Sequence, residues 1–249
     1  MKNLLAVFCF MSILLFSRCS KSDVSAAAGA SNNKNVGASA RDLLSGDVYQ
    51  SINLEILYMP GYLPDAAAIN NLTSFINSLV KKPGGIQVTY KPIAASGKTT
   101  LTLEELRAIE KANRSVFTSG NAIGVCLMYT DGGYSQVNTL GVAHLNTSMA
   151  IFGKTVHDNS GGINQPTQTK LETIVTEHEF GHILGLVDLG SPMLVNHKET
   201  STNTNHCNNT SCLMYFATNV NSMGGILISG PVPVLDANCK NDLTANGGK

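Results

Sequence analysis

The sequence has no tryptophan, and aromatic residues make up only 6% of its 249 positions. A surface on which bases or sugar rings stack needs such side chains, so a site of that kind is not expected. An excess of one charge is also missing, because 17 basic residues are matched by 17 acidic residues. Nucleic-acid binding requires a basic surface, so we expect no nucleic-acid partner. At 43% hydrophobic residues, the chain is still apolar enough to form a folded core.

The first residues have the features of an export signal. Lys2 precedes Leu4–Phe16, an uncharged run that is too short to cross a bilayer but matches the apolar core of a secretory signal. Cys19 follows closely, in a position that resembles the lipid-attachment cysteine of bacterial lipoproteins. We therefore predict a signal peptide at 1–18 and an exported protein of the cell envelope with a lipid anchor at Cys19. Ordinary signal cleavage, which gives a periplasmic or secreted protein, is the alternative.

Residues 19–46 are rich in small and polar side chains and have no apolar periodicity. This composition is typical of a flexible tether rather than of a helix or strand. We therefore expect one folded domain over 47–249, which is within the usual size range of a single domain.

Export places the remaining cysteines in an oxidising compartment, where an even number favours disulfide bonds. The four that follow the signal are Cys126, Cys207, Cys212 and Cys239. The short spacing between Cys207 and Cys212 favours a small loop closed by this pair, which leaves Cys126 to pair with Cys239. The other two pairings, and a zinc site made by all four thiolates, are the alternatives.

Apolar periodicity predicts an alternation of strands and helices. Five segments have the alternating or continuously apolar pattern of strands: 51–58, 86–93, 122–129, 139–144 and 148–152. Helical spacing occurs over 65–80, over 103–117, from a capping-box sequence at Thr169–Glu172 to about Gly185, and near 235–243. This order indicates a largely parallel sheet with crossover helices. After Leu189 most of the sequence has the composition of loops.

The third of these helices carries residues that can bind a metal ion and transfer protons. His178 and His182 are one helical turn apart, so both imidazoles project from one face and can bind one metal ion. Zinc suits neutral imidazole nitrogens and leaves a coordination position open for water. Glu179 is turned about 100° from His178 around the helix, so it can reach that water without binding the metal and act as a general base. A pair of core histidines is the alternative, but it would need polar partners that the neighbouring residues do not supply.

Gly185 adds a family resemblance to this motif. The string His-Glu-x-x-His-x-x-Gly, from His178 to Gly185, resembles the metzincin zinc peptidases. In those enzymes the glycine lets the chain turn sharply out of the helix and bring a third ligand to the zinc. The resemblance therefore implies that Gly185 has a structural role of this kind.

A second string supports the same family. Ser211–Tyr215 is similar to the methionine-containing turn beneath the metal of metzincins, with Met214 as its methionine. His206-Cys207, followed by Cys212 and Met214, resembles the archaemetzincin branch. The resemblance implies an α+β, metzincin-like fold: a twisted mixed sheet with crossover helices, an active-site helix, and an irregular C-terminal subdomain with the Met turn.

The third zinc ligand is where the sequence departs from the family pattern. Metzincins usually supply it three residues after the glycine, which here is Asp188, and a carboxylate is a competent zinc ligand. Counting back from the Met turn gives His206 instead, as in archaemetzincins. His197 lies in the insertion between them. We expect His206 to be the ligand, and Asp188 and then His197 are the alternatives.

The resemblance implies a zinc-dependent endopeptidase that acts on protein or peptide substrates with one catalytic zinc ion and Glu179 as general base. An extended substrate would pair with a strand at the sheet edge, which we expect at Thr147–Phe152. The alternative function is a catalytically inactive, metzincin-like surface binding protein. The presence of Glu179 argues against it, because a purely structural zinc site has no need of that base.

Overall fold

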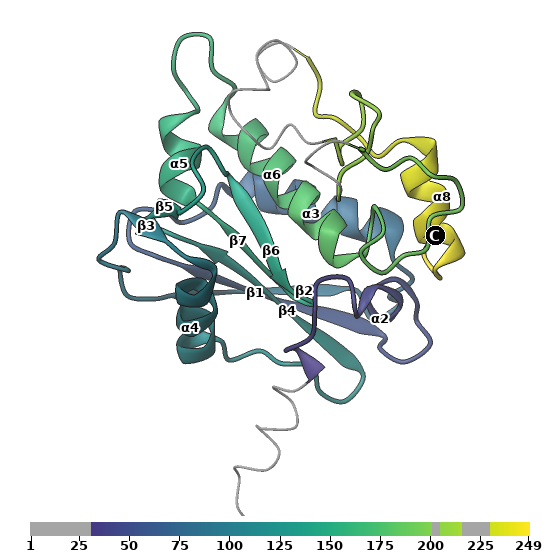
Figure 1. The fold of residues 1–249 in the computed structure, drawn as a ribbon. Helices are drawn as coiled ribbons and strands as arrows, with labels where there is room; N and C mark the ends of the chain where they lie inside the picture. Colours follow the sequence, from purple (N-terminus) through teal and green to yellow (C-terminus); the bar gives the residue numbers. More distant parts are fainter. Residues whose placement is uncertain (1–30, 201–204, 216–229) are drawn as a thin grey trace, which may run out of the picture.

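The computed structural model describes residues 31–200, 205–215 and 230–249 (Figure 1). The predicted signal peptide at 1–18 and Cys19, with its predicted lipid anchor, lie outside these residues. Within the described ranges, no helix combines the length and the apolar character needed to span a membrane.

A five-stranded sheet lies at the centre of the fold, with the strand order β2–β1–β4–β7–β6 (Figure 1). Its strands are β1 (Ser51–Tyr58), β2 (Ile86–Pro92), β4 (Ala122–Tyr129), β6 (Gly141–Leu145) and β7 (Ser148–Ile151). The first four in spatial order are parallel, and β6 runs antiparallel to β7. β4 is buried along nearly its whole length, which explains its continuously apolar sequence. All five predicted strands are confirmed.

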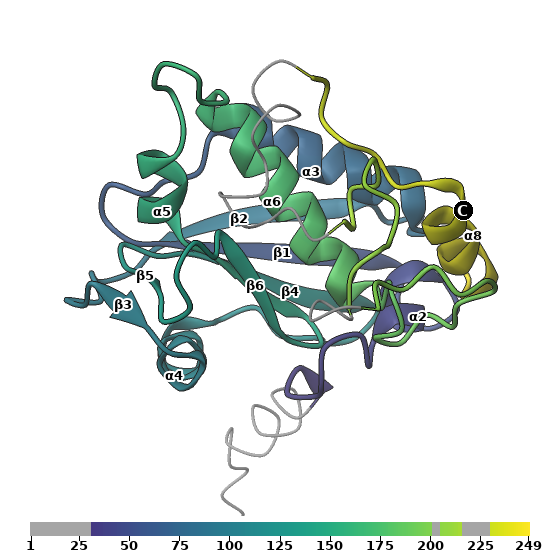
Figure 2. The ribbon, with the colours of Figure 1, turned by 45° about the horizontal axis from the view of Figure 1, so that its top comes forward.

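Two long helices cover one face of the sheet, and one covers the other (Figure 2). On the first face lie α3 (Ala66–Leu79) and α6 (Gln168–Ile183), which contact each other, and on the second lies α4 (Leu103–Asn113). The shorter elements are α5 (Gly153–Asp158), α8 (Ala237–Ala245), and the paired strands β3 (Thr100–Leu101) and β5 (Gly133–Tyr134). The predicted alternation of strands and crossover helices is therefore confirmed.

Capping residues set where the long helices begin. Asp65 caps α3, and Thr102 starts a complete capping box on α4. The predicted capping box at Thr169 on α6 is wrong, because the N-cap is Thr167. The carboxylate of Glu172, which the predicted box would have used, instead accepts the Asp65 N–H at 2.8 Å and so joins the starts of α3 and α6.

The α6 helix is buried on every side, from Leu171 to Ile183. One face of α6 lies on the sheet, and the residues of the C-terminal segment, including Met214, cover another part of it. This position explains why its polar residues are as buried as its apolar ones. The two histidines and the glutamate of the sequence motif therefore lie inside the protein rather than on an exposed helix face.

The predicted tether is wrong for residues 31–46, which are part of the folded domain. The buried Asn32 amide donates to the Thr118 and Thr147 hydroxyls at 3.0 and 2.8 Å and to the Gly124 carbonyl at 3.0 Å. A short helix, α2 (Ala40–Leu44), adds two fully buried leucines to the core. One buried hydrogen-bonding side chain and a single turn of helix are enough to anchor this segment, although its composition is that of a linker.

We expect Asn32→Ala to lower the free energy of unfolding by about 2–3 kcal/mol, because it leaves the amide of Thr118 and two hydroxyls without their buried partner. Urea denaturation followed by circular dichroism measures this change. The neighbouring Asn33 is exposed, so Asn33→Ala is the matched control and should stay within about 0.5 kcal/mol of the parent. Equal stability of the two variants would contradict the anchoring role of Asn32.

Candidate metal centres

The helix α6 brings His178 and His182 together. Their Nε2 atoms are 3.1 Å apart, and the two side chains belong to residues that are only 1% and 8% exposed. Nδ1 of His178 donates to the backbone carbonyl of Leu213 at 2.8 Å. Because the carbonyl can only accept, Nδ1 carries the proton and the Nε2 lone pair faces His182.

His206 completes this group. Its ring centroid lies 5.2 Å from that of His178 and 5.1 Å from that of His182. The ligating nitrogens of the three residues lie within 4.8 Å of one another. Asp188, by contrast, is exposed and forms an ion pair with Lys198 at 2.9 Å. Of the three candidates for third ligand, the structure thus brings His206 to the pair and leaves Asp188 and His197 elsewhere.

The electrostatics of this three-histidine group suit a metal cation. Burial, together with the nearby His206, lowers the pKa of His178 to about 3. Burial and the other two imidazoles also lower the pKa of His182 well below its usual value. Neutral imidazole is the form that binds zinc, and a cation between the three rings could accept a lone pair from each of them. The donor set therefore fits a zinc ion.

Glu179 lies against the backbone of β6. Its buried carboxylate accepts the Ala143 N–H at 2.7 Å. Burial raises the pKa of Glu179 to about 8, and the Ala143 hydrogen bond acts in the opposite direction. Gly141 permits this approach, since a β-carbon there would lie 2.8 Å from Cγ of Glu179. The carboxylate is thus held at the strand edge.

The chain leaves α6 through a Schellman turn at Gly185, which has a φ of +79°. The Gly185 N–H donates to the His182 carbonyl at 2.9 Å, and the Leu186 N–H donates to the Gly181 carbonyl at 3.1 Å. A β-carbon at Gly185 would lie 2.5 Å from the Ser191 nitrogen. Glycine is therefore required both by the backbone conformation and by the close approach of the following loop.

The segment around Met214 lies directly beneath the histidine pair. Met214 is fully buried, and a β-carbon on Gly181 would lie 2.4 Å from its sulfur. Gly181, one of the unspecified positions of the sequence motif, therefore has to be small for the turn to approach the helix. The preceding residue, Leu213, supplies the carbonyl that orients His178. No local pattern in the sequence indicates this role for Gly181, because the contact depends on a turn more than 30 residues away.

The predicted edge strand at Thr147–Phe152 is wrong. This segment forms β7, which lies between β4 and β6 inside the sheet. The edge belongs to β6, because the chain reverses at Asn146 and Thr147 and pairs β6 antiparallel to β7. The outward edge of β6 carries the Ala143 amide that contacts Glu179, so the sheet edge adjoins the helix that carries His178 and His182.

The predicted disulfides are wrong, since Cys126, Cys207, Cys212 and Cys239 are all free thiols. Cys126 lies in the smaller core cluster on the α4 side of the sheet, whereas the other three belong to the larger cluster. This separation also excludes Cys126 from a four-cysteine zinc site. The sulfur atoms of Cys212 and Cys239 are 3.7 Å apart, which is a contact between thiols rather than a bond.

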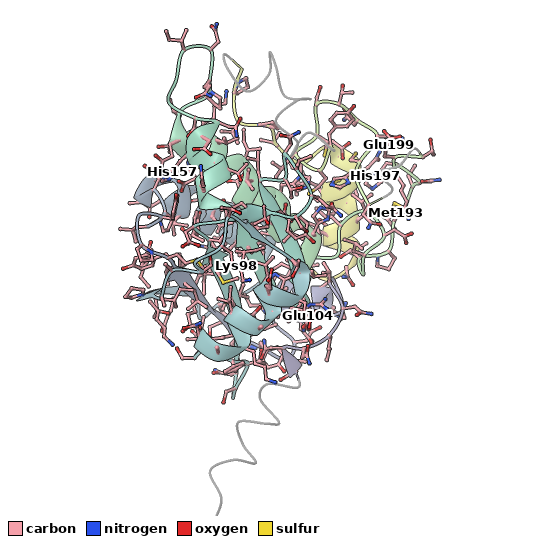
Figure 3. All side chains as sticks on the ribbon, turned by 60° about the vertical axis from the view of Figure 1, so that its left-hand side comes forward. Lys98, Glu104, His157, Met193, His197 and Glu199 are labelled. Carbon is pink, nitrogen blue, oxygen red and sulfur yellow. The ribbon has the colours of Figure 1, made fainter. Side chains whose placement is uncertain are left out.

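His197, rather than Cys126, lies beside the cysteines of the C-terminal segment. Its Nδ1 lies 3.4 Å from the sulfur of Cys207 and 3.9 Å from that of Cys239. Its Nε2 donates to the Asp242 carboxylate of α8 at 2.8 Å, so the Nδ1 lone pair points toward the sulfurs. Figure 3 shows His197 beside the yellow helix α8. We call His197, Cys207, Cys212 and Cys239 the sulfur cluster.

The sulfur cluster has the donors of a structural zinc site. The ligand atoms of His197, Cys207, Cys239 and the nearby Asp236 lie within 4.8 Å of one another. Hydrogen bonds from the thiols of Cys207 and Cys239 lower the pKa of Cys212 to about 4. Three thiolates and one imidazole are a common ligand set for structural zinc. The short spacing of Cys207 and Cys212 could suggest half of this site. The position of Cys239, which α8 brings beside them, could not be predicted from the sequence.

Comparisons with known proteins give a fold but no close relative. No protein-family model matches the chain, and no curated protein matches it in sequence. Among the solved structures that resemble it is archaemetzincin from Methanopyrus kandleri, with a TM-score of 0.54 and 13% sequence identity. The match covers 79% of this chain and 96% of that chain. The predicted α+β, metzincin-like fold is therefore confirmed.

We expect His206→Ala to weaken metal binding at the three-histidine group by more than the roughly 10–100-fold typical of losing an outer-shell partner. Asp188→Asn should leave it unchanged, because Asp188 lies outside the group. Titration with cobalt(II) measures both affinities, and the absence of a sulfur-to-cobalt charge-transfer band separates this group from the sulfur cluster. A larger loss in Asp188→Asn than in His206→Ala would show that the carboxylate is the ligand.

Proposed function

We propose that the protein is a zinc-dependent endopeptidase, in which His178, His182 and His206 hold one catalytic zinc ion. The observation that supports this function is the convergence of three imidazole nitrogens within 4.8 Å of one another, with the Glu179 carboxylate on the same helix. The metzincin-like fold is consistent with it. A purely structural zinc site would not require an ionisable glutamate beside the first histidine.

Glu179 would act as the general base. A zinc ion bound by three protein ligands polarises the scissile carbonyl and acidifies water. Glu179 would accept the proton of the attacking water and transfer it to the leaving amine. This role needs an ionised carboxylate, which burial disfavours. The Ala143 N–H and a cation at the three histidines both favour the charged form and would offset the burial.

The outward edge of β6 is the proposed docking line for the substrate. Among the residues that the structure describes, β6 pairs only with β7, which leaves backbone groups on its outward side for an extended peptide. Since β6 adjoins Glu179 through Ala143, a peptide added there would pass close to Glu179, on the helix that carries His178 and His182. Backbone pairing of this kind predicts a substrate that is unfolded or locally extended.

We also propose that the sulfur cluster holds a second, structural zinc ion. Cys207 directly follows His206 in the chain, and its N–H donates to the Met214 carbonyl at 2.7 Å. The Cys212 sulfur accepts the Met214 N–H at 3.4 Å. A metal that fixes these two cysteines would therefore fix the third histidine and the Met turn in a part of the chain that has little regular secondary structure.

The alternative is a metzincin-like binding protein without catalytic activity. The two functions differ in what zinc-loaded protein does to a generic unfolded substrate such as reduced casein. Cleavage that a chelator abolishes supports the peptidase. A protein that retains zinc at the three histidines but leaves all unfolded substrates intact supports the binding protein.

We expect Glu179→Gln to lower turnover by about 10²–10⁴-fold while zinc content stays unchanged, because the variant removes the base but no ligand. Mass spectrometry of casein fragments and metal analysis measure the two effects. Glu177→Gln is the matched control, since it makes the same change in a buried residue of the same helix. Undiminished cleavage by Glu179→Gln would refute the proposed mechanism.

We expect Cys239→Ser to remove one zinc ion per chain and to destabilise the protein by about 4 kcal/mol when free zinc exceeds its dissociation constant a thousandfold. Metal analysis and thermal unfolding measure these losses. Cys126→Ser, a buried thiol outside the sulfur cluster, controls for the substitution itself and should keep the full zinc content. If both variants kept the same zinc content, the sulfur cluster would not be a metal site.

A further inference from the structure

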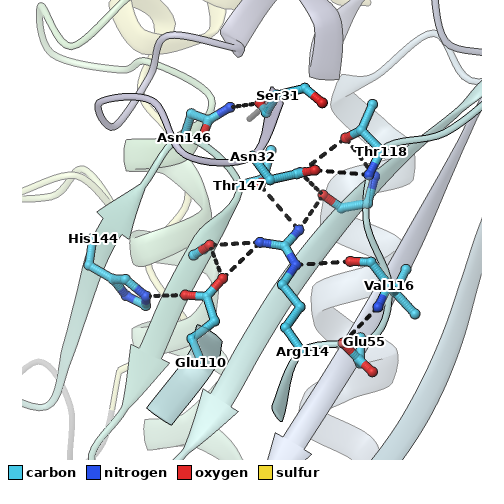
Figure 4. Close-up of polar contacts among 12 residues, drawn as sticks. Ser31, Asn32, Glu55, Glu110, Arg114, Val116, Thr118, His144, Asn146 and Thr147 are labelled. Carbon is cyan, nitrogen blue, oxygen red and sulfur yellow. Dashed lines mark hydrogen bonds and ion pairs between the residues drawn. The ribbon is translucent and has the colours of Figure 1, made fainter. Parts of the chain in front are cut away.

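A buried charged cluster lies on the α4 side of the sheet, opposite α6. Glu110 of α4 forms an ion pair with Arg114 at 2.8 Å and contacts Nε2 of His144 at 2.5 Å (Figure 4). The Ser148 hydroxyl donates to the same carboxylate at 2.6 Å. Burial would raise the pKa of Glu110, but the hydrogen bond and charge of His144, with Arg114 and Ser148, lower it to about 2. Glu110 is therefore an ionised group inside the protein.

Burying such a cluster costs desolvation free energy, and apolar side chains of the same volume often stabilise a fold equally well. Its position suggests a more specific role. His144 is the additional residue of an irregularity in β6: Ala143 pairs with Met149, whereas Leu145 already pairs with Ser148. Irregularities of this kind redirect the backbone and are frequent beside functional sites.

Two side chains of α4 hold this one residue of β6. Glu110 binds the His144 ring, and Arg107 donates to the His144 carbonyl at 2.8 Å. The residue before it, Ala143, donates its N–H across the other side of the strand to Glu179 at 2.7 Å. The backbone of β6 therefore connects a rigid charged cluster on one face of the sheet to the candidate base on the other.

We propose that Glu110, His144 and Arg107 are positioning residues for Glu179: they fix the irregularity in β6 and so aim the Ala143 amide at the carboxylate. This inference rests on the proposed peptidase function for its catalytic consequence. The positioning itself does not depend on that function. The link from these three residues to Glu179 runs through the backbone of β6 at Ala143 and His144.

Arg107→Gln is the most informative variant, because Arg107 is exposed and the shorter side chain loses the His144 carbonyl without opening the core. We expect kcat to fall by about tenfold with KM, zinc content and melting temperature unchanged. Arg107→Lys keeps a cationic donor and should restore most of the turnover. Lys111→Gln, one turn further along the exposed side of α4, is the matched control and should behave as the parent protein.

A second measurement separates this inference from the proposed function. Amide hydrogen exchange at Ala143 should become about tenfold faster in Arg107→Gln and in Glu110→Gln, and should not change in Lys111→Gln. If the parent protein cleaves nothing but the exchange changes as stated, the positioning holds and the peptidase proposal fails. If exchange at Ala143 is the same in all variants, or if kcat is unchanged although exchange is faster, the positioning role is overturned.

Discussion

Three imidazoles have to lie close to one another, and much of the structure serves this requirement. Two of them come from one turn of a helix, where the geometry of the helix itself sets their separation. The third, His206, comes from a segment without regular secondary structure, so other contacts have to hold it. Those contacts include the Glu199 N–H, which donates to the His206 carbonyl at 2.8 Å. They also include the Met214 carbonyl, which accepts the N–H of the adjacent Cys207, and the sulfur cluster around that cysteine.

Close approach between backbones is the second condition that the site imposes. Gly141 brings β6 against Glu179, Gly181 brings Met214 beneath the helix, and Gly185 turns the chain away from it. Each of these glycines removes a β-carbon that would otherwise overlap a neighbour by a wide margin. Together they explain how a helix that carries ionisable groups can be enclosed on all sides and still present them to a single point.

The sequence predicts best what short-range periodicity controls. The strands, the helices and the one-turn spacing of His178 and His182 follow from local patterns, and these predictions are confirmed by the fold. The errors concern long-range contacts. The anchoring of Asn32 in the sheet, the return of β6 to make the edge, and the meeting of His197 with Cys239 each join segments that are distant in the chain. The predicted cysteine pairing is wrong for the same reason. Export favours disulfides in general, but the neighbours of each thiol come from distant parts of the chain.

The adjacency of His206 and Cys207 has a consequence for how the protein would respond to its surroundings. The imidazole belongs to the three-histidine group and the thiol to the sulfur cluster, yet a single peptide bond joins the two residues. An oxidant or an alkylating agent that modifies the thiol would therefore displace the imidazole as well. Peptide hydrolysis by the proposed peptidase would therefore be sensitive to thiol reagents, although no cysteine takes part in the proposed reaction.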